Sequence, residues 1–310
     1  MRYVILRSGG RAVPSITADE FKALLPAICD RETSQDAEHW TPENPLVGHC
    51  AVVSLVAQNL FGGELLRGSL LEVPGFEYMR SHYWNRLADG TVEDFTKPQF
   101  GDKYPEGLKS EPKDRSYVLF DPKTGAPREI MKRYKLLAWR LAKALSGGNP
   151  LFEDGYYRQC FDAALDSPCQ KMKFGCVITH GGYHVIYKGC NETIPGLKTL
   201  CEPKCIRFGI ASRTESMLGA CGHAEERGIW TIVGQGRPLA GCKLYVAGFY
   251  PNGLPWIKER AEHTCLRCAV QMNYAGLDAV VVPTVIGWVS MTTAVALETA
   301  LAYATGEKKV

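Results

Sequence analysis

The sequence predicts an α/β protein of two domains, the second built on a layered sheet. The first observation is length, because 310 residues suggest two domains more readily than one. The second is composition, because a hydrophobic share of 45% supplies enough apolar side chains for real cores. The third is order: in the second half, short apolar runs alternate with helical stretches. We place the boundary at Ser146-Gly-Gly-Asn-Pro150, which divides the chain into domains 1–148 and 149–310.

Charge and cysteine content narrow the class of protein. The net charge of +3 and the pI near 8.2 are too mild to indicate a nucleic-acid binder. The 12 cysteines accompany neither small size nor a signal peptide, so we expect reduced thiols with metal-binding or catalytic roles. No run reaches the ~18 apolar residues that a membrane helix requires. We therefore expect a cytoplasmic homo-oligomer with a small-molecule substrate and no membrane partner.

Two helices are expected early in the chain. Residues 15–25 contain a capping box, since Thr17 is followed three residues later by Glu20. From Cys50 to Leu60 the pattern suits a largely buried helix, which two glycines then end. Cys50 therefore stands at a helix N-terminus, a position that lowers the pKa of a thiol.

Residues 81–96 have the pattern of a β-hairpin whose turn decides which side chains share a face. A two-residue loop at Asp89-Gly90 would place Asp94 on the face opposite His82. A three-residue loop, with the glycine left-handed as the bulge residue, shifts the register by one. Asp94 then faces Trp84, and His82 becomes its diagonal neighbour, about 7 Å away between backbones. In that register a carboxylate can orient an imidazole.

Cys50, His82 and Asp94 could together act as nucleophile, base and orienting carboxylate. The region resembles the YunG family through NPLVGHC, FGGELLRG, SHYWNRL-DG and DFTKPQF, over roughly residues 40–101. The resemblance implies a papain-like or transglutaminase-like α+β fold and a site of this kind, without defining a reaction. The alternative is that Cys50 is a small buried hydrophobic residue and His82 a hydrogen-bonded core histidine.

The first domain is expected to end in a loop and a basic helix. Residues 101–126 are rich in Gly, Pro and Lys, which predicts a loop. Residues 127–146 carry an apolar stripe at helical spacing and a largely basic opposite side. A basic helix can touch phosphates, but a solvated face on a packed helix explains the same pattern.

The second domain is expected to alternate helices and strands. Its first helix covers residues 154–166, and a glycine turn joins strands at 174–179 and 183–187. The later elements are a helix at 223–234, a strand at 243–248, a helix at 265–275, a strand at 278–283 and a closing helix at 290–304. This order indicates a layered α/β sheet.

A metal-ligand pattern lies across the two central helices of this domain. His223 is followed two residues later by Glu225, and Cys265 and Cys268 follow in Cys-x-x-Cys spacing. One imidazole and two thiolates can hold three corners of a tetrahedral Zn²⁺ site, with the fourth open for water. Zinc lowers the pKa of that water from about 15.7 to about 7, and Glu225 would carry its proton to a leaving amino group. The alternative is a chance His-x-Glu with a redox or incidental Cys-x-x-Cys.

Residues 154–285 resemble the zinc-dependent cytidine and deoxycytidylate deaminases, nearest to the deoxycytidylate branch. Beyond HAEE and CLRC, the resemblance rests on Gly189-Cys-Asn191 and on Cys201-x-x-x-Cys205-Ile-Arg207. It implies a cytidine-deaminase-like α/β/α fold, a zinc cofactor and a sugar contact from Asn191, for which a turn residue is the alternative. Two departures leave the substrate open: Thr264 replaces the family's proline, and residues 249–263 form a long segment where the family has its active-site rim.

The expected reaction is hydrolytic deamination of a nucleobase within a free pyrimidine nucleotide, such as dCMP or CMP. Arg207 and Arg213 are candidates to bind the 5′-phosphate, since one phosphate needs only one or two cations. One alternative is a deaminase that acts on RNA or single-stranded DNA, which would need a basic groove with stacking aromatics. Another is an N-terminal amidase, peptidase or acyltransferase, with the zinc half as a binding module.

Four further cysteines lead into the metal helix, namely Cys190, Cys201, Cys205 and Cys221. Together they could hold a second, structural zinc. The segment has few strong core residues, so a metal would stabilise it. The alternative is a set of reduced cysteines in a loop that caps the substrate.

Overall fold

The computed structural model describes residues 6–8, 11–13, 15–105, 107–194, 197, 205–207, 210, 219, 221–250 and 252–307. Arg213 and Cys201 of the predicted sites lie outside these residues. The chain forms two compact units. One contains residues 15–145, and the other contains residues 146–307 with a short hairpin, β1 (Leu6–Ser8) and β2 (Arg11–Val13).

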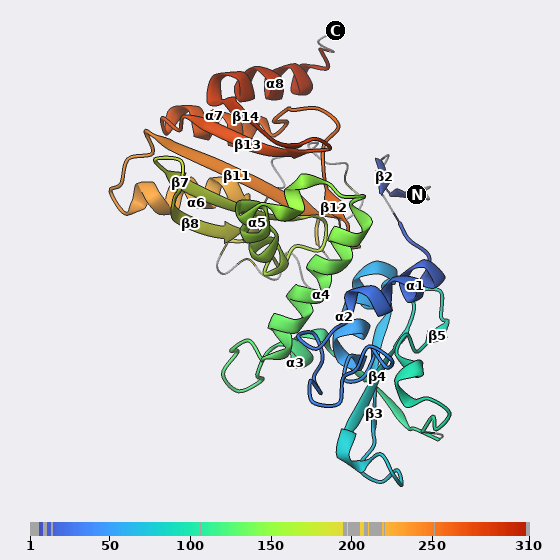
Figure 1. Cartoon of the computed structure of the whole chain (residues 1–310). Coiled ribbons are helices and arrows are strands. Elements are labelled where there is room, and N and C mark those ends of the chain that lie inside the picture. The colour runs from blue at the N-terminus through green and yellow to red at the C-terminus, as the bar shows by residue number, and fades with distance from the viewer. Residues whose placement is uncertain are drawn as a thin grey trace. The chain divides into compact units, whose positions relative to one another are not determined.

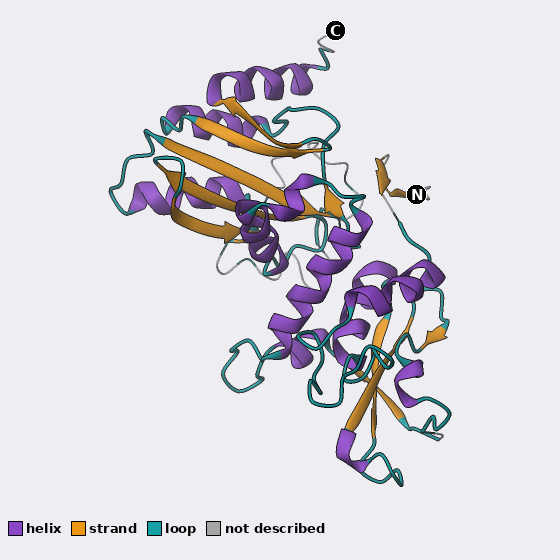
Figure 2. Cartoon of the chain, viewed as in Figure 1, coloured by secondary structure: helices purple, strands orange, loops and turns teal. Residues whose placement is uncertain are grey.

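The N-terminal unit combines helices with a separate antiparallel sheet (Figures 1 and 2). Its strands lie in the order β5-β4-β3-β6, and helix α2 packs against β4. The elements are α1 (Ala18–Ile28), α2 (Cys50–Phe61), β3 (Glu64–Ser69), η1 (Glu77–Met79), β4 (Ser81–Arg86), β5 (Val92–Glu93), η2 (Lys97–Phe100), β6 (Ser110–Lys113), α3 (Arg115–Leu119) and α4 (Ile130–Leu145). The unit is α+β in composition, and its papain-like or transglutaminase-like fold stays a prediction.

The predicted helices of this unit are present. Thr17 caps α1, its hydroxyl accepting from Glu20 N at 3.1 Å while the Glu20 carboxylate accepts from Thr17 N at 2.8 Å. The loop expected over residues 101–126 is wrong in part, because the segment contains β6 and α3. Strand β6 exists through its pairing with β3, which lies more than forty residues earlier in the chain and leaves no local signal.

The hairpin adopts the three-residue loop. Leu87 N donates to Thr91 O at 2.8 Å, and Gly90 N donates to Leu87 O at 3.0 Å. Gly90 has φ +89°, the left-handed conformation that glycine tolerates best. The pairing of Asn85 with Glu93 continues this register toward Asp94. The prediction that Asp94 and His82 share one face of the hairpin is therefore confirmed.

The C-terminal unit is built on a sheet with strand order β14-β13-β11-β7-β8 (Figure 1). Strand β11 runs parallel to β13, while the other neighbours along this order are antiparallel, and β12 pairs with β11. The strands are β7 (Lys173–His180), β8 (His184–Cys190), β11 (Cys242–Phe249), β12 (Pro255–Trp256), β13 (Ala279–Thr284) and β14 (Gly287–Thr292), with a separate pair of β9 (Glu192–Thr193) and β10 (Cys221–Gly222).

Helices cover both faces of this sheet, as predicted. Helix α5 (Gly155–Leu165) packs on one face, where the rings of Tyr156 and Tyr245 lie 4.5 Å apart. Three further helices pack on the other face: α6 (Ala224–Gly234), α7 (Leu266–Tyr274) and α8 (Thr293–Thr305). They form a buried cluster with alternate residues of the strands, including Leu244 and Val280. The unit is therefore a three-layer α/β/α fold.

The closing helix begins later than predicted. The expected helix over residues 290–304 starts at Thr293, and residues 287–292 form β14. Strand β14 pairs along its whole length with β13, whose six residues are all buried. Strand β13 is the hydrogen-bonding partner that makes residues 287–292 a strand, and the local sequence pattern does not contain this information.

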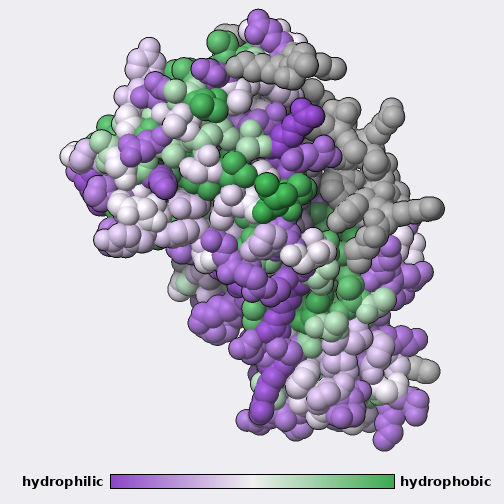
Figure 3. All heavy atoms as spheres, turned by 45° about the horizontal axis from the view of Figure 1, so that its top comes forward, coloured by the Kyte–Doolittle hydropathy of each residue, from purple (hydrophilic) through white to green (hydrophobic). Residues whose placement is uncertain are grey.

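The face of the molecule drawn in Figure 3 mixes polar and apolar side chains. In the view of Figure 3, hydrophilic side chains cover much of the visible face, with hydrophobic ones in smaller groups between them. Within the described part of the chain, no helix is both long and apolar enough to cross a membrane.

Candidate active site

The predicted metal ligands come together at the start of two helices. His223 is the N-cap of α6, Cys265 is the N-cap of α7, and Cys268 lies in the first turn of α7. His223 Nδ1 lies 3.2 Å from Cys268 Sγ and 3.3 Å from Cys265 Sγ, and the two sulfurs are 3.3 Å apart. Zinc bonds of about 2.0–2.3 Å at tetrahedral angles separate neighbouring ligand atoms by about 3.5 Å. Among the described residues, this is the one group of three or more potential ligands close enough to share an ion.

One of the two sulfurs, that of Cys265, favours the charged form that zinc binds. The neighbouring Cys268 thiol and the His223 ring lower the pKa of Cys265 to about 5, against the effect of burial. Burial raises the pKa of Cys268, which is completely inaccessible. Both cysteines lie where unpaired amides at a helix start favour negative sulfur. One imidazole and two such sulfurs fit a structural or catalytic Zn²⁺.

Glu226 joins the two metal-bearing helices. Its carboxylate is 3% exposed and accepts from His223 N at 3.0 Å. The same carboxylate pairs with Arg267 and accepts from Gln271, both on α7. Glu226 therefore holds the start of α6 against α7, which keeps the three metal ligands together. Sequence reasoning missed this role, although the spacing from His223 to Glu226 is that of a capping box.

The predicted proton carrier, Glu225, lies beside a histidine that sequence reasoning also missed. His263 Nε2 is 3.4 Å from Glu225 Oε1, and the two residues are 4% and 8% exposed. Burial acts to raise the pKa of Glu225, but His263 and His223 overcome it and lower that pKa. Thr299 holds His263 by accepting from its backbone N–H at 3.2 Å and donating to its carbonyl at 3.0 Å. The signal in the sequence was a histidine two residues before the first cysteine ligand.

Asn191 lies next to His223, but its side chain is largely used by the protein. Strands β9 and β10 pair Glu192 with Gly222, and the next position in this register places Asn191 opposite His223. Its Oδ1 accepts from Phe174 N at 2.7 Å and from Ser167 Oγ at 2.8 Å. Its Nδ2 donates to the Met172 carbonyl at 2.9 Å, which leaves one of its two N–H bonds for a ligand.

Arg207 lies beside a lysine. Lys171 Nζ donates to the Arg207 carbonyl at 3.3 Å, and burial together with the Arg207 charge lowers the pKa of Lys171. Cys205 N donates to Gln170 Oε1 at 3.1 Å, which ties the Arg207 segment to the loop after α5. Ser167 of the same loop contacts Asn191, so this loop links the two predicted substrate ligands.

The second predicted metal site is not assembled among the described residues. Cys190, Cys205 and Cys221 are not part of a shared ligand group there, and Cys201 lies outside those residues. Burial raises the pKa of Cys190, which disfavours a thiolate. The structural zinc stays a prediction.

In the N-terminal unit, the predicted histidine and carboxylate are in contact. His82 Nε2 lies 2.7 Å from Asp94 Oδ2, and His82 is completely buried. Cys50 is half-buried at the first position of α2.

Two family models match this chain. Residues 17–146 match the YunG protein family, and residues 152–284 match the cytidine and deoxycytidylate deaminase zinc-binding region. A comparison with curated proteins found no match. The first half of the chain is therefore similar to YunG proteins, and the second half carries the zinc-binding region of the deaminases, so the protein is a zinc-dependent deaminase in general terms.

Proposed function

We propose that the C-terminal unit hydrolytically deaminates the base of a free pyrimidine nucleotide, dCMP or CMP, and releases ammonia. The observation that carries this proposal is the position of Glu225. It lies in the first turn of the helix that His223 caps, it is buried, and it contacts His263. A purely structural zinc site would give a buried, ionised carboxylate at this position no role.

The chemistry divides between the cofactor and the side chains. Zinc bound by His223, Cys265 and Cys268 would supply a hydroxide nucleophile at neutral pH. Glu225 acts as the proton carrier, because its lowered pKa keeps the carboxylate ionised at neutral pH, so that it can accept a proton from the nucleophile and pass it to the leaving amino group. His263 orients this carboxylate from its other side.

The support for a nucleotide comes from two groups that the loop after α5 links. Asn191 retains one N–H opposite His223, within the reach of a sugar hydroxyl. Lys171 and Arg207 place two cationic residues together, enough for a single phosphate. Arg213, the other predicted phosphate ligand, lies outside the described residues. A free nucleotide fits this limited positive charge better than a polymer, whose grip would need a basic groove.

The test is an ammonia-release screen over pyrimidine and purine bases, nucleosides, 5′-monophosphates and single-stranded oligonucleotides. We expect dCMP or CMP to be the best substrate and the corresponding nucleoside to be at least about tenfold poorer. Arg207→Ala should remove that preference, whereas Arg237→Ala, in the turn after α6, should preserve it. Turnover of oligonucleotides alone would replace the proposal with a nucleic-acid deaminase. An unchanged rate in Glu225→Gln would refute the mechanism.

A further inference from the structure

The N-terminal unit contains a second constellation that deamination does not use. Asp94 is almost saturated with donors: its Oδ1 accepts from Thr96 N at 3.0 Å and Thr96 Oγ at 3.1 Å, and its Oδ2 accepts from His82 at 2.7 Å and Tyr104 at 3.1 Å. A carboxylate held in this way accepts only, so His82 Nε2 must donate to it. The proton of a neutral His82 ring therefore lies on Nε2, and Nδ1 carries the free lone pair.

That lone pair is buried and has no hydrogen-bond partner within the described residues. The ring is held in place by the Trp84 ring stacked at 5.5 Å and the Phe100 edge at 4.9 Å. Asn85 of the same strand donates to the Ser54 carbonyl at 3.0 Å, which fixes β4 against α2. Cys50 is one helical turn before Ser54, so α2 brings its sulfur to the His82 end of the strand. Burial disfavours a charged ring, but Asp94 and the neighbouring Cys50 sulfur raise the pKa of His82 to about 9.

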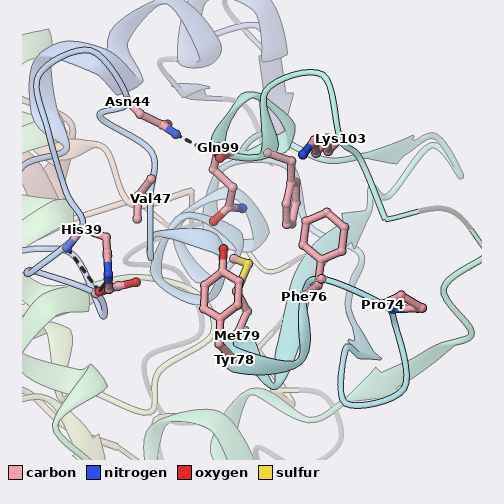
Figure 4. Close-up of a pocket in the computed structure, with 12 residues that line it drawn as sticks. His39, Asn44, Val47, Pro74, Phe76, Tyr78, Met79, Gln99 and Lys103 are labelled. Carbon is pink, nitrogen blue, oxygen red and sulfur yellow. Dashed lines mark hydrogen bonds and ion pairs between the residues drawn. The ribbon is translucent and has the colours of Figure 1, made fainter.

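A pocket of about 770 Å³ lies beside this pair. One of its walls contains Val47, three residues before Cys50, and another contains Phe100, which contacts His82. Figure 4 shows Phe76, Tyr78 and Met79 around the same space, so a large part of the wall is apolar or aromatic.

Gln99 lines this pocket, and its side chain has a buried polar atom that lacks a hydrogen-bond donor among the described residues. Gln99 is 7% exposed, and its Nε2 donates to Thr96 Oγ at 3.1 Å. The Thr96 hydrogen is itself donated to Asp94, so Thr96 must accept from Gln99, and this fixes the orientation of the amide. Gln99 Oε1 then remains a buried acceptor without a partner in the described part of the chain. A peptide N–H would satisfy it, and the apolar wall would hold an adjacent hydrophobic side chain.

We propose that Cys50, His82 and Asp94 form a second active site, which hydrolyses an amide bond next to an apolar residue of a peptide-like substrate. His82 Nδ1 takes the thiol proton, and the Cys50 sulfur attacks the carbonyl carbon. The C–N bond breaks and the amine leaves with the proton held by His82, which leaves a thioester on Cys50. Water then attacks the thioester while His82 takes a proton from it. The S–C bond breaks, the carboxylic acid is released, and His82 returns its proton to the Cys50 sulfur, which regenerates the free thiol.

The start of α2 supports the charge that develops in this reaction. At the start of α2, Val53 N donates to the His49 carbonyl. The N–H groups of the first turn therefore point out of the N-terminal end of the helix, where Cys50 lies. A helix N-terminus stabilises a thiolate or an oxyanion at this position.

The experiment uses the full chain and two probes, aminocoumarin amides of N-acetylated amino acids and a phenylalanyl-glycyl vinyl sulfone. We expect aminocoumarin release from amides of apolar residues and covalent labelling of Cys50, located by mass spectrometry. Cys50→Ser should abolish both, while Cys29→Ala, a buried thiol of the same unit, should retain both. Gln99→Met should raise KM about tenfold, the effect of one lost hydrogen bond.

The histidine is tested through its partner, because a substitution of the fully buried ring can unfold the unit. Asp94→Asn should lower the amide turnover about 100-fold or more, the range of general-base effects, and should shift the pH profile of Cys50 labelling upward. Circular dichroism checks that this variant is folded. No release from any amide, or the same labelling profile in the wild type and in Asp94→Asn, would overturn the proposal.

Discussion

The two sites use the same types of side chain in opposite arrangements. In the C-terminal unit, two sulfurs lie within 3.3 Å of one nitrogen of His223, and the carboxylate of Glu225 contacts a different histidine. In the N-terminal unit, the carboxylate contacts the imidazole itself, and a single cysteine, Cys50, neighbours the ring. An imidazole among sulfurs is a metal ligand, whereas an imidazole between a carboxylate and a thiol is a base. The partner of each ring therefore indicates its chemistry more reliably than the residue types do.

The largest effect should come from removing one sulfur of the metal site. Cys265→Ser should lower the zinc content from one ion per chain to less than about one tenth and reduce deamination at least about 1000-fold, because a hydroxyl is a far weaker zinc ligand than a thiolate. Elemental analysis and ammonia release measure the two quantities. Cys242→Ala, a buried thiol of the same unit, should keep its zinc. A zinc-free protein with full activity would show that the two sites do not differ in the way described.

The next effect distinguishes the sites by pH. The pKa of His82 rises from 6.5 to about 9 on folding. The stabilising contribution of the charged ring is thus complete below pH 6.5 and is lost as the pH rises through 9. At 1.36 kcal/mol for each pKa unit, this contribution is about 3 kcal/mol, or roughly 300-fold in the unfolding equilibrium. The groups facing the ring are Asp94, Tyr104 and Cys50.

Denaturant unfolding at pH 6 and pH 9, followed by tryptophan fluorescence, checks this contribution. Asp94→Asn should flatten the loss of stability between these two pH values, because the ring then lacks the charge that raises its pKa. An equally steep loss in this variant would mean that His82 is not responsible for it.

A smaller effect is expected for the histidine beside Glu225. His263→Ala should lower kcat about 10–100-fold, the usual cost of removing a group that orients a metal-site residue, while zinc content and KM change little. His263→Gln should recover part of the rate, because an amide can still donate to Glu225. A loss that appears mainly in KM would indicate that His263 binds substrate instead of orienting the carboxylate.

The last effect concerns stability alone and tests the link between the two metal helices. Glu226→Gln should reduce the stability of the C-terminal unit by about 1.5–3 kcal/mol. The reason is that the charged hydrogen bond from Arg267 to the Glu226 carboxylate is replaced by a weaker one to a neutral amide. Glu192→Gln removes a partly exposed ion pair with Arg227 and should cost less than about 1 kcal/mol. Thermal unfolding with and without a zinc chelator compares them. Equal shifts in both variants would remove the special role of Glu226.

Local sequence was sufficient for several features of both sites. The turn glycine determined the hairpin register, and with it the contact between His82 and Asp94, because side chains alternate faces with a period of two. The Cys-x-x-Cys spacing likewise predicted that both sulfurs lie in one helical turn, and the structure brings them to His223. In each case the partners lie within a short segment or belong to a motif.

Other features were decided only by tertiary structure. The contact of His263 with Glu225 joins two residues that are far apart in the sequence. It depends on the hydrogen bonds by which Thr299 holds the loop before α7. The free acceptor of Gln99 depends on the prior use of the Thr96 hydroxyl by Asp94. Local pattern specifies which groups a segment offers, but only packing decides which of their hydrogen bonds are already made and which remain for a substrate.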